Sequence, residues 1–318
     1  MPAVTAKASG KIILFGEHAV VYGFPAIAVP IQSVQVKVTV LPIVKGSHSL
    51  IKIRNLDWEE DIIFSDLENN DPIKASIMNV LSLIDGKPPF FELTISSSIP
   101  IAAGLGSSAA LAIAITQGLS QFLGINFSKD QINELAFQSE KIQHGSPSGI
   151  DNSVISFGKP IYFLKGSPLV QIEIPTPLNI ILGDSGKRTL TKDVVTEVKT
   201  LLDSDSTTVQ PILENIGSIT KDALIALQTG NLVQIGKLMS YNHESLKKLG
   251  VSSFELDQLV DAAIKSGALG AKLCGGGQGG FMAALCGSES IEKISAGLRS
   301  AGAANIINTT IGMTGSKE

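Results

Sequence analysis

Short apolar runs separated by turn residues fill most of the first hundred positions. The clearest are KIILFG from Lys11, VQVKVTV from Val34, LIKIRN from Leu50, DIIFS from Asp61 and FELTIS from Phe91. Runs of this length that are rich in β-branched residues and bounded by turns are typical of β-strands. We therefore expect the N-terminal part of the chain to be built around a sheet.

The period of the pattern changes near residue 105, where helices are expected up to residue 145. Strand-like runs return between residues 162 and 183, and a 3.6-residue period then predicts helices over 191–265. A strand, helix and strand pattern closes the chain. This order predicts an α+β fold with mixed sheets. Pro175 and Pro177 favour a boundary there, which gives expected domains of 1–178 and 179–318.

Composition sets limits on the class of protein. The chain has 318 residues, of which 44% are hydrophobic and 17% charged, enough for a large core and two domains. A net charge of -4 gives no general attraction to nucleic acid or to an anionic membrane. The most apolar window, residues 99–115, is interrupted by glycines and serines, so no membrane span is expected and the protein should be cytoplasmic.

Cysteine and histidine usage predicts no structural metal. Cys274 and Cys286 are the two cysteines, and the four histidines do not stand at zinc-binding spacings with them or with each other. We expect two reduced thiols, and Cys274 in particular as a small buried residue rather than a nucleophile.

The stretch PIAAGLGSSAALAIAI, which begins at Pro100, places glycines and hydroxyls directly before a predicted helix that starts near Ser107. Backbone N–H groups and the positive end of a helix dipole converge at such a point, and this favours phosphate. Gly104 and Gly106 would leave room for the anion, while Ser107 and Ser108 offer hydroxyls to phosphate or magnesium. An ordinary turn before a buried helix is the alternative.

Other phosphate-binding motifs fail on their context. Gly104, Gly106 and Ala109 match a loose GxGxxA, but no strand ending in an acidic residue follows about 20 residues later. Gly275, Gly277 and Gly280 lead into a strand rather than a helix, and the chain contains no GxxxxGK[ST]. A dinucleotide-binding fold and a Walker-type loop are therefore both disfavoured.

Polar residues at three further places have ordinary explanations when each is taken alone. Ser128 and Gln131 form a capping box for a helix on which Glu140 is expected to be half-buried, as an ion-pair partner or a metal ligand. Asp151 follows in the turn-rich stretch GSPSGIDN, where a local cap is the default. The segment GEH, with Glu17 and His18, is expected as an exposed, salt-bridged turn.

Taken together, four segments resemble the motifs of the GHMP kinases in order and approximate spacing. They are SGKIILFGEHAVVYG, PIAAGLGSSAA, SEKIQHGSPSGIDN and GAKLCGGGQGGF, and they span Lys11 to Phe281. The first and third are most similar to those of family members that act on mevalonate. The resemblance implies an N-terminal α+β domain, a C-terminal ferredoxin-like domain, and phosphorylation of the primary hydroxyl of mevalonate by ATP with Mg²⁺. It also implies a homodimer as a family-level expectation.

The resemblance assigns a role to each matching position. It makes Asp151 the catalytic carboxylate with Lys11 close by, and it gives the magnesium ion to Ser108 and Glu140. Glu17, His18, Ser148, Asp151 and Thr191 would face the substrate. The loop that wraps the nucleotide phosphates would consist of Pro100, Ile101, Ala102, Ala103, Gly104, Leu105, Gly106, Ser107, Ser108 and Ala109.

Departures from the family pattern leave some features open. Cys274, Gly276 and Gln278 replace the usual threonine, alanine and glycine of the last motif, and Gln278 adds a side chain to a crowded loop. A kinase of phosphomevalonate, homoserine or a sugar remains an alternative, as does a lyase that resembles diphosphomevalonate decarboxylase. A silent small-molecule binder is disfavoured because Lys11, Ser108, Glu140 and Asp151 are all present.

Overall fold

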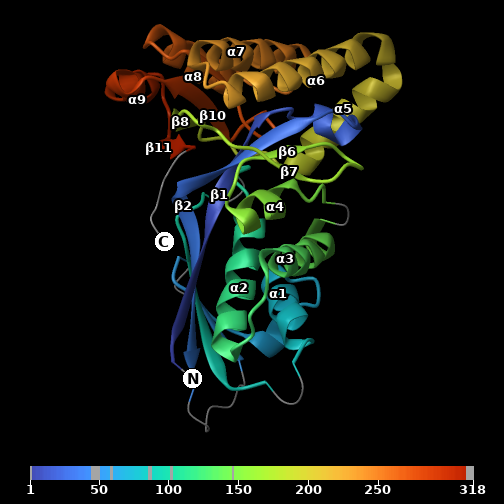
Figure 1. The fold of residues 1–318 in the computed structure, drawn as a ribbon, viewed down its shortest axis with the longest axis vertical. Helices are drawn as coiled ribbons and strands as arrows, with labels where there is room; N and C mark the ends of the chain where they lie inside the picture. The colour runs from blue at the N-terminus through green and yellow to red at the C-terminus, as the bar shows by residue number, and fades with distance from the viewer. Residues whose placement is uncertain are drawn as a thin grey trace. The chain divides into compact units, whose positions relative to one another are not determined.

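The protein forms two compact units, each of which draws on separate stretches of the chain. The computed structural model describes residues 2–43, 51–57, 60–84, 88–100, 103–144 and 147–312 (Figure 1). One unit comprises Met1–Gly10, Val34–Pro100 and Gly106–Gly158, and the other comprises Lys11–Ser33, Ile101–Leu105 and Lys159–Glu318. Strands β1 (Val4–Phe15) and β2 (Ala26–Pro42) contribute to both. The units thus interleave along the sequence, and the predicted division at residue 178 stays a prediction.

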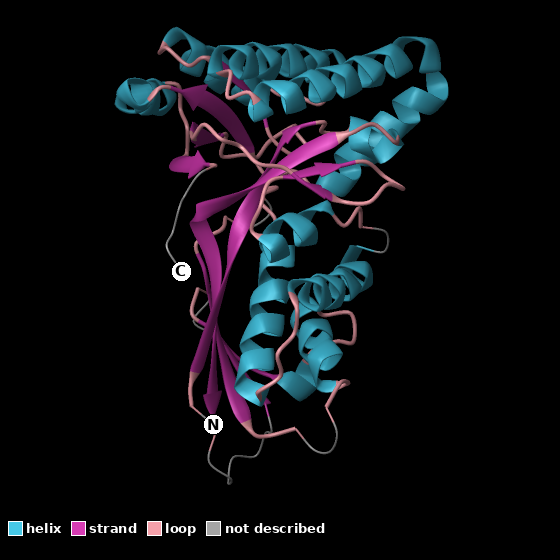
Figure 2. Cartoon of the chain, viewed as in Figure 1, coloured by secondary structure: helices cyan, strands magenta, loops and turns pink. Residues whose placement is uncertain are grey.

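The first unit packs helices on one face of a mixed sheet (Figure 2). Strand β5 (Phe91–Ser97) lies between β2, with which it is antiparallel, and β3 (Ile51–Asn55), with which it is parallel; β4 (Glu60–Ile63) completes this edge. The covering helices are α1 (Pro72–Leu81), α2 (Ser107–Leu123), α3 (Lys129–His144) and α4 (Ile150–Phe157). Helix α2 approaches the sheet at Gly118, where a Cβ would lie 3.3 Å from Val40 of β2. This contact sets the height of α2 above the strands.

The second unit contains a four-stranded antiparallel sheet in the order β11-β8-β10-β9. Its elements run β8 (Leu178–Asp184), α5 (Thr191–Ser204), α6 (Ser206–Gln228), α7 (Leu232–Lys248), α8 (Phe254–Lys265), β9 (Gly270–Leu273), β10 (Phe281–Cys286), α9 (Ile291–Ser300) and β11 (Asn305–Ile311). A strand, helices, two strands, a helix and a final strand in this order give the ferredoxin-like topology. The helices and the sheet bury a common apolar core that includes Leu213, Leu246, Leu259 and Met282.

Smaller elements complete the second unit. Residues Ala26–Ala28 of β2 pair with β6 (Ile161–Phe163), which pairs in turn with β7 (Val170–Gln171). Short 3₁₀ helices are η1 (Ala19–Tyr22) and η3 (Ser288–Ser290); a third, η2 (Phe64–Asp66), belongs to the first unit. Within the described ranges, none of the helices combines the length and apolar character needed to cross a bilayer.

The α+β class and most predicted elements are confirmed, with two helices missed. Helix α1 lies where only strands and turns were expected; Asp71 caps it by accepting from the N–H groups of Ile73 and Lys74, and Pro72 opens it. Helix α4 replaces the expected turn-rich stretch around Asp151. The prediction of mixed sheets is correct for the first sheet and wrong for the second, whose strand pairs are antiparallel.

Candidate functional site

Helix α2 begins at Ser107, as the sequence predicts, directly after a bend made by glycines. Gly104 has φ of 74° and Gly106 has φ of 78°, a region in which a side chain would be strained. The first N–H groups of an α-helix have no partner within the helix, so they point toward whatever lies at its N-terminus. Pro100 and Ala103–Ala109 of the predicted phosphate loop are described, whereas Ile101 and Ala102 lie outside the described residues.

Glu140 and Ser108 meet at this N-terminus. The Ser108 hydroxyl donates to the Glu140 Oε1 atom, which joins α2 to α3. Glu140 is only 7% exposed, so the expectation of a half-buried carboxylate underestimated its burial. A hydroxyl and a carboxylate are hard oxygen donors, which suit Mg²⁺ shared with nucleotide phosphates better than zinc or another soft metal. The donor set therefore fits the predicted magnesium site.

Asp151 and Ser148 stand at the start of α4. Gly149, with φ of 83°, forms the N-cap, and the Ile150 N–H donates to the Ser148 hydroxyl over 3.4 Å. Asn152, which follows Asp151, is buried and donates to the Asn133 Oδ1 atom of α3 over 2.6 Å. Asp151 thus lies in the first turn of a helix that is fixed to α3, rather than in the local cap that the sequence suggested.

Lys11 lies within β1 of the second unit, beside the first part of the phosphate loop. It is 4% exposed, and its backbone N–H donates to the Leu105 carbonyl over 2.9 Å. A Cβ on Gly104 would lie 3.9 Å from the Cα atom of Gly275. The first and last sequence motifs are therefore neighbours of the phosphate loop in this unit. Asp151 belongs to the first unit, so its pairing with Lys11 stays a prediction.

Glu17 and His18 are buried, which corrects the expectation of an exposed turn. They are 1% and 5% exposed, respectively. The Glu17 carboxylate accepts from the Lys272 ammonium at Oε1 and from the Asn242 amide, 3.0 Å away, at Oε2. A buried carboxylate needs such partners because desolvation of an unpaired charge is costly. The salt bridge expected for GEH exists, but as a buried one.

His18 is held in an unusual backbone conformation, with φ of 61°. Its Nε2 atom lies 2.8 Å from the Gly276 carbonyl, which can only accept, so the ring proton is on Nε2. Its Nδ1 atom is buried and has no hydrogen-bond partner among the described residues. Burial lowers the pKa of His18, which keeps the ring neutral and leaves Nδ1 as an acceptor.

Thr191 lies against the same glycine. A Cβ on Gly276 would lie 3.0 Å from the Thr191 Oγ1 atom, so the alanine that the family usually has would crowd the threonine here. Gln278 adopts φ of 54°; its N–H donates to the Val251 carbonyl and its side chain to Glu197, over 2.8 and 2.6 Å. The added side chain of Gln278 therefore extends toward α5.

Both cysteines are free and buried. Burial raises the pKa of Cys274 to about 12, which removes the nucleophilic thiolate at neutral pH. The prediction of a small buried residue at Cys274 is confirmed.

Sequence reasoning missed Lys272, Asn242 and His243. Lys272 is fully buried within β9, and a lone lysine in the apolar run GAKLC was the one available signal. Asn242 and His243 sit on a helix whose apolar period gave no reason to single them out. Asn242 contacts a residue 225 positions away and His243 one 30 positions away, and no local pattern encodes such contacts.

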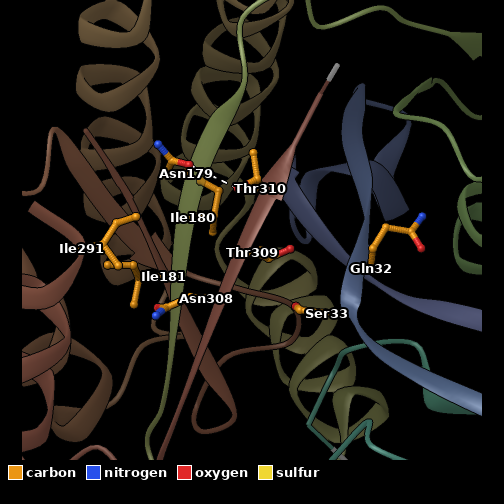
Figure 3. A pocket seen from close by; sticks show the side chains of 9 residues that line it. All are labelled: Gln32, Ser33, Asn179, Ile180, Ile181, Ile291, Asn308, Thr309 and Thr310. Carbon is orange, nitrogen blue, oxygen red and sulfur yellow. Dashed lines mark hydrogen bonds between the residues drawn. The ribbon is translucent and has the colours of Figure 1, made fainter. Parts of the chain in front are cut away.

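A separate hollow of about 240 Å³ lies on the second unit, against strands β8 and β11 (Figure 3). Asn179 and Thr310, whose side chains are 3.2 Å apart, line it together with Ile291 and residues at the middle of β2. Its described lining carries no charged side chain, and none of the predicted site residues belongs to it. It has no feature of a phosphate-transfer site.

Family models and proteins of known function match most of this chain. The family models for the N-terminal and C-terminal domains of GHMP kinases match residues 73–159 and 223–304. The mevalonate kinase of Thermococcus onnurineus is 36% identical over 311 residues, 92% of each chain, and that of Saccharolobus solfataricus is 34% identical over 97% of this chain and 96% of its own.

Solved structures also match over nearly the whole chain. The crystal structure of L. major mevalonate kinase in complex with R-mevalonate has a TM-score of 0.84 at 27% identity, covering 98% of this chain and 96% of its own. Methanococcus jannaschii mevalonate kinase has a TM-score of 0.84 at 28% identity over 98% of each chain. The chain belongs to the GHMP kinase family.

Proposed function

We propose that the protein transfers the terminal phosphoryl group of ATP to the primary hydroxyl of mevalonate. The observation that carries the phosphoryl-transfer assignment is the buried Glu140 carboxylate against Ser108 at the N-terminus of α2. Two observations support mevalonate as the acceptor. Relatives of about 35% identity are named mevalonate kinase, and a similar solved structure is a complex with R-mevalonate. Cytoplasmic location and a homodimer remain predictions from the sequence and the family.

The loop Pro100–Ala109 would hold the nucleotide phosphates. The N-terminus of α2 attracts negative charge through its N–H groups and its dipole, and Gly104 and Gly106 keep side chains out of the anion's space. Ser108 and Glu140 would hold Mg²⁺, which would neutralise charge on the transferring phosphoryl group.

Asp151 would receive or orient the proton of the mevalonate hydroxyl, while Lys11 stabilises the developing negative charge. Phosphoryl transfer depends mainly on positioning and charge neutralisation, so an orienting role and a general-base role both suit a carboxylate fixed on α4.

Glu17, His18, Ser148 and Thr191 would face mevalonate. A neutral His18 whose Nδ1 atom accepts a hydrogen bond suits an alcohol substrate. Lys272 compensates the charge of Glu17, so the buried carboxylate does not add an unbalanced negative charge beside an anionic substrate. These features support one carboxylate and hydroxyls as the recognised groups.

A coupled ADP-release assay tests the proposal across mevalonate, phosphomevalonate, homoserine and galactose, with Mg²⁺ present. Mevalonate should give the highest kcat/KM. Another substrate that wins by about tenfold, roughly 1.4 kcal/mol of transition-state stabilisation, would overturn the assignment. Carbon dioxide release in step with ADP, measured with diphosphomevalonate, would show a lyase instead.

A further inference from the structure

Two adjacent residues of α7, Asn242 and His243, contact Glu17 and the end of strand β9. Asn242 and His243 are 0% and 3% exposed, so both polar side chains are removed from solvent. Buried polar side chains are retained where their hydrogen bonds are made, and a pair of them on one helix turn is unusual in an apolar core. All the partners described below belong to the second unit.

Asn242 and Lys272 hold the two oxygens of the Glu17 carboxylate separately. The Asn242 amide donates to Oε2 over 3.0 Å, and the Lys272 ammonium donates to Oε1. Lys272 also donates to the Leu273 carbonyl over 2.7 Å, which fixes the ammonium at the end of β9. Because each oxygen has its own donor, the carboxylate has one preferred rotation.

His243 fixes the backbone on which Lys272 sits. The Leu273 N–H donates to the His243 Nδ1 atom over 3.3 Å, so the ring proton is on Nε2, which lies 3.2 Å from the Asp257 Oδ1 atom. Asp257 is held in turn by Ser252 at 2.6 Å and by Lys247 at 3.2 Å. The series of contacts runs from α8 through the imidazole to the residue next to Lys272.

Helix α7 and strand β9 are also in direct backbone contact. A Cβ on Gly270 would lie 1.8 Å from the Gly236 carbonyl oxygen, so the two glycines allow an approach that no other residue would permit. The helix cannot shift along the strand without breaking this contact. Asn242 and His243 therefore project from a fixed support.

We infer that Asn242 and His243 are positioning residues that fix the buried Glu17 carboxylate beside His18, Asn242 directly and His243 through Leu273 and Lys272. The inference rests on the proposed role of Glu17 in facing mevalonate. Neither residue touches substrate or the transferring phosphoryl group in this account. Displacement of a substrate-facing group by about 1 Å can reduce the rate by about a hundredfold, so a support of this kind has a measurable effect.

The test uses His243→Leu, which removes both hydrogen bonds of the ring, and His243→Gln, whose amide retains an acceptor and a donor. Asn242→Leu removes the donor to Glu17, and Asn242→Ser removes it without adding apolar bulk if the leucine variant does not fold. Ser245→Ala is the matched control, because Ser245 is buried on the same helix but bonds to Asn215 and Tyr241 instead.

We expect His243→Leu and the Asn242 variants to lower kcat/KM for mevalonate by about tenfold or more, while KM for ATP stays within about twofold. His243→Gln should recover most of the loss, and Ser245→Ala should leave both KM values unchanged. Melting temperatures would be recorded for each variant, so that a general loss of stability is separated from a selective loss of mevalonate recognition.

Two results would overturn the inference: an unchanged KM and kcat for mevalonate in folded His243→Leu and Asn242 variants, or equal losses toward mevalonate and ATP. Failure of the wild-type protein to phosphorylate mevalonate would instead contradict the proposed function, and it is measured first. The two failures are therefore distinguishable.

Discussion

Replacement of Lys272 by methionine should be among the most damaging single substitutions in the chain. Lys272 and Glu17 have fully buried side chains, so Lys272→Met leaves a carboxylate in the core whose described side-chain donor is the Asn242 amide alone. Removal of one partner of a buried ion pair costs about 3–5 kcal/mol. At about 2–4 °C per kcal/mol, the melting temperature should fall by roughly 6–20 °C.

The assay is thermal unfolding followed by circular dichroism, with two further variants. Glu17→Gln added to Lys272→Met removes the stranded charge and should recover a large part of the loss, because an uncharged buried pair is tolerated. Lys237→Met, an exposed lysine on α7, should shift the melting temperature by less than about 2 °C. A Lys272→Met shift no larger than this control, or no recovery in the double variant, would refute the reasoning.

Three other predictions follow from the site. Glu140→Gln should raise the Mg²⁺ concentration needed for half-maximal rate and lower kcat by about tenfold or more without changing the melting temperature; unchanged Mg²⁺ dependence would make Glu140 structural only. Gly106→Val should weaken ATP and ADP in calorimetric titrations more than mevalonate, because the glycine has φ of 78°; parallel losses would count against a phosphate loop. Stability should fall as pH drops from 6.5 toward 4. In the folded protein, burial lowers the pKa of His243 to about 4, with Asp257, Lys247 and Lys272 as its charged neighbours. In this pH range the unfolded chain therefore binds the proton first, which favours unfolding. Urea titrations of wild type and His243→Gln across this range would check it, since the variant should lose part of the slope.

Local patterns predicted the parts of the site that depend on neighbours in sequence. The start of α2 at Ser107 follows from Gly106, and the capping box of Ser128 and Gln131 forms as expected, with bonds of 2.9 and 3.2 Å. Helix α1 was missed because the turn residues around it obscured its cap, Asp71 before Pro72. The signal for helix α1 was therefore present in the sequence.

The burial of Glu17 was not predictable in the same way. Its depth depends on Lys272 and Asn242, which are 255 and 225 positions away. GEH in isolation has the composition of a surface turn, and only tertiary contacts supply the cation and the amide that make burial tolerable. The hydrogen bond from His18 to the Gly276 carbonyl is likewise supplied by a different part of the chain, 258 positions away.

The most direct measurement of the central claim is the structure of the product formed from mevalonate and ATP. Coupled ³¹P and ¹H NMR of the reaction mixture identifies the oxygen that carries the new phosphate. We expect one phosphomonoester whose phosphorus couples to the protons of the primary carbon, with one ADP formed for each. A phosphate on the tertiary oxygen, or ADP formed without any phosphorylated mevalonate, would contradict it.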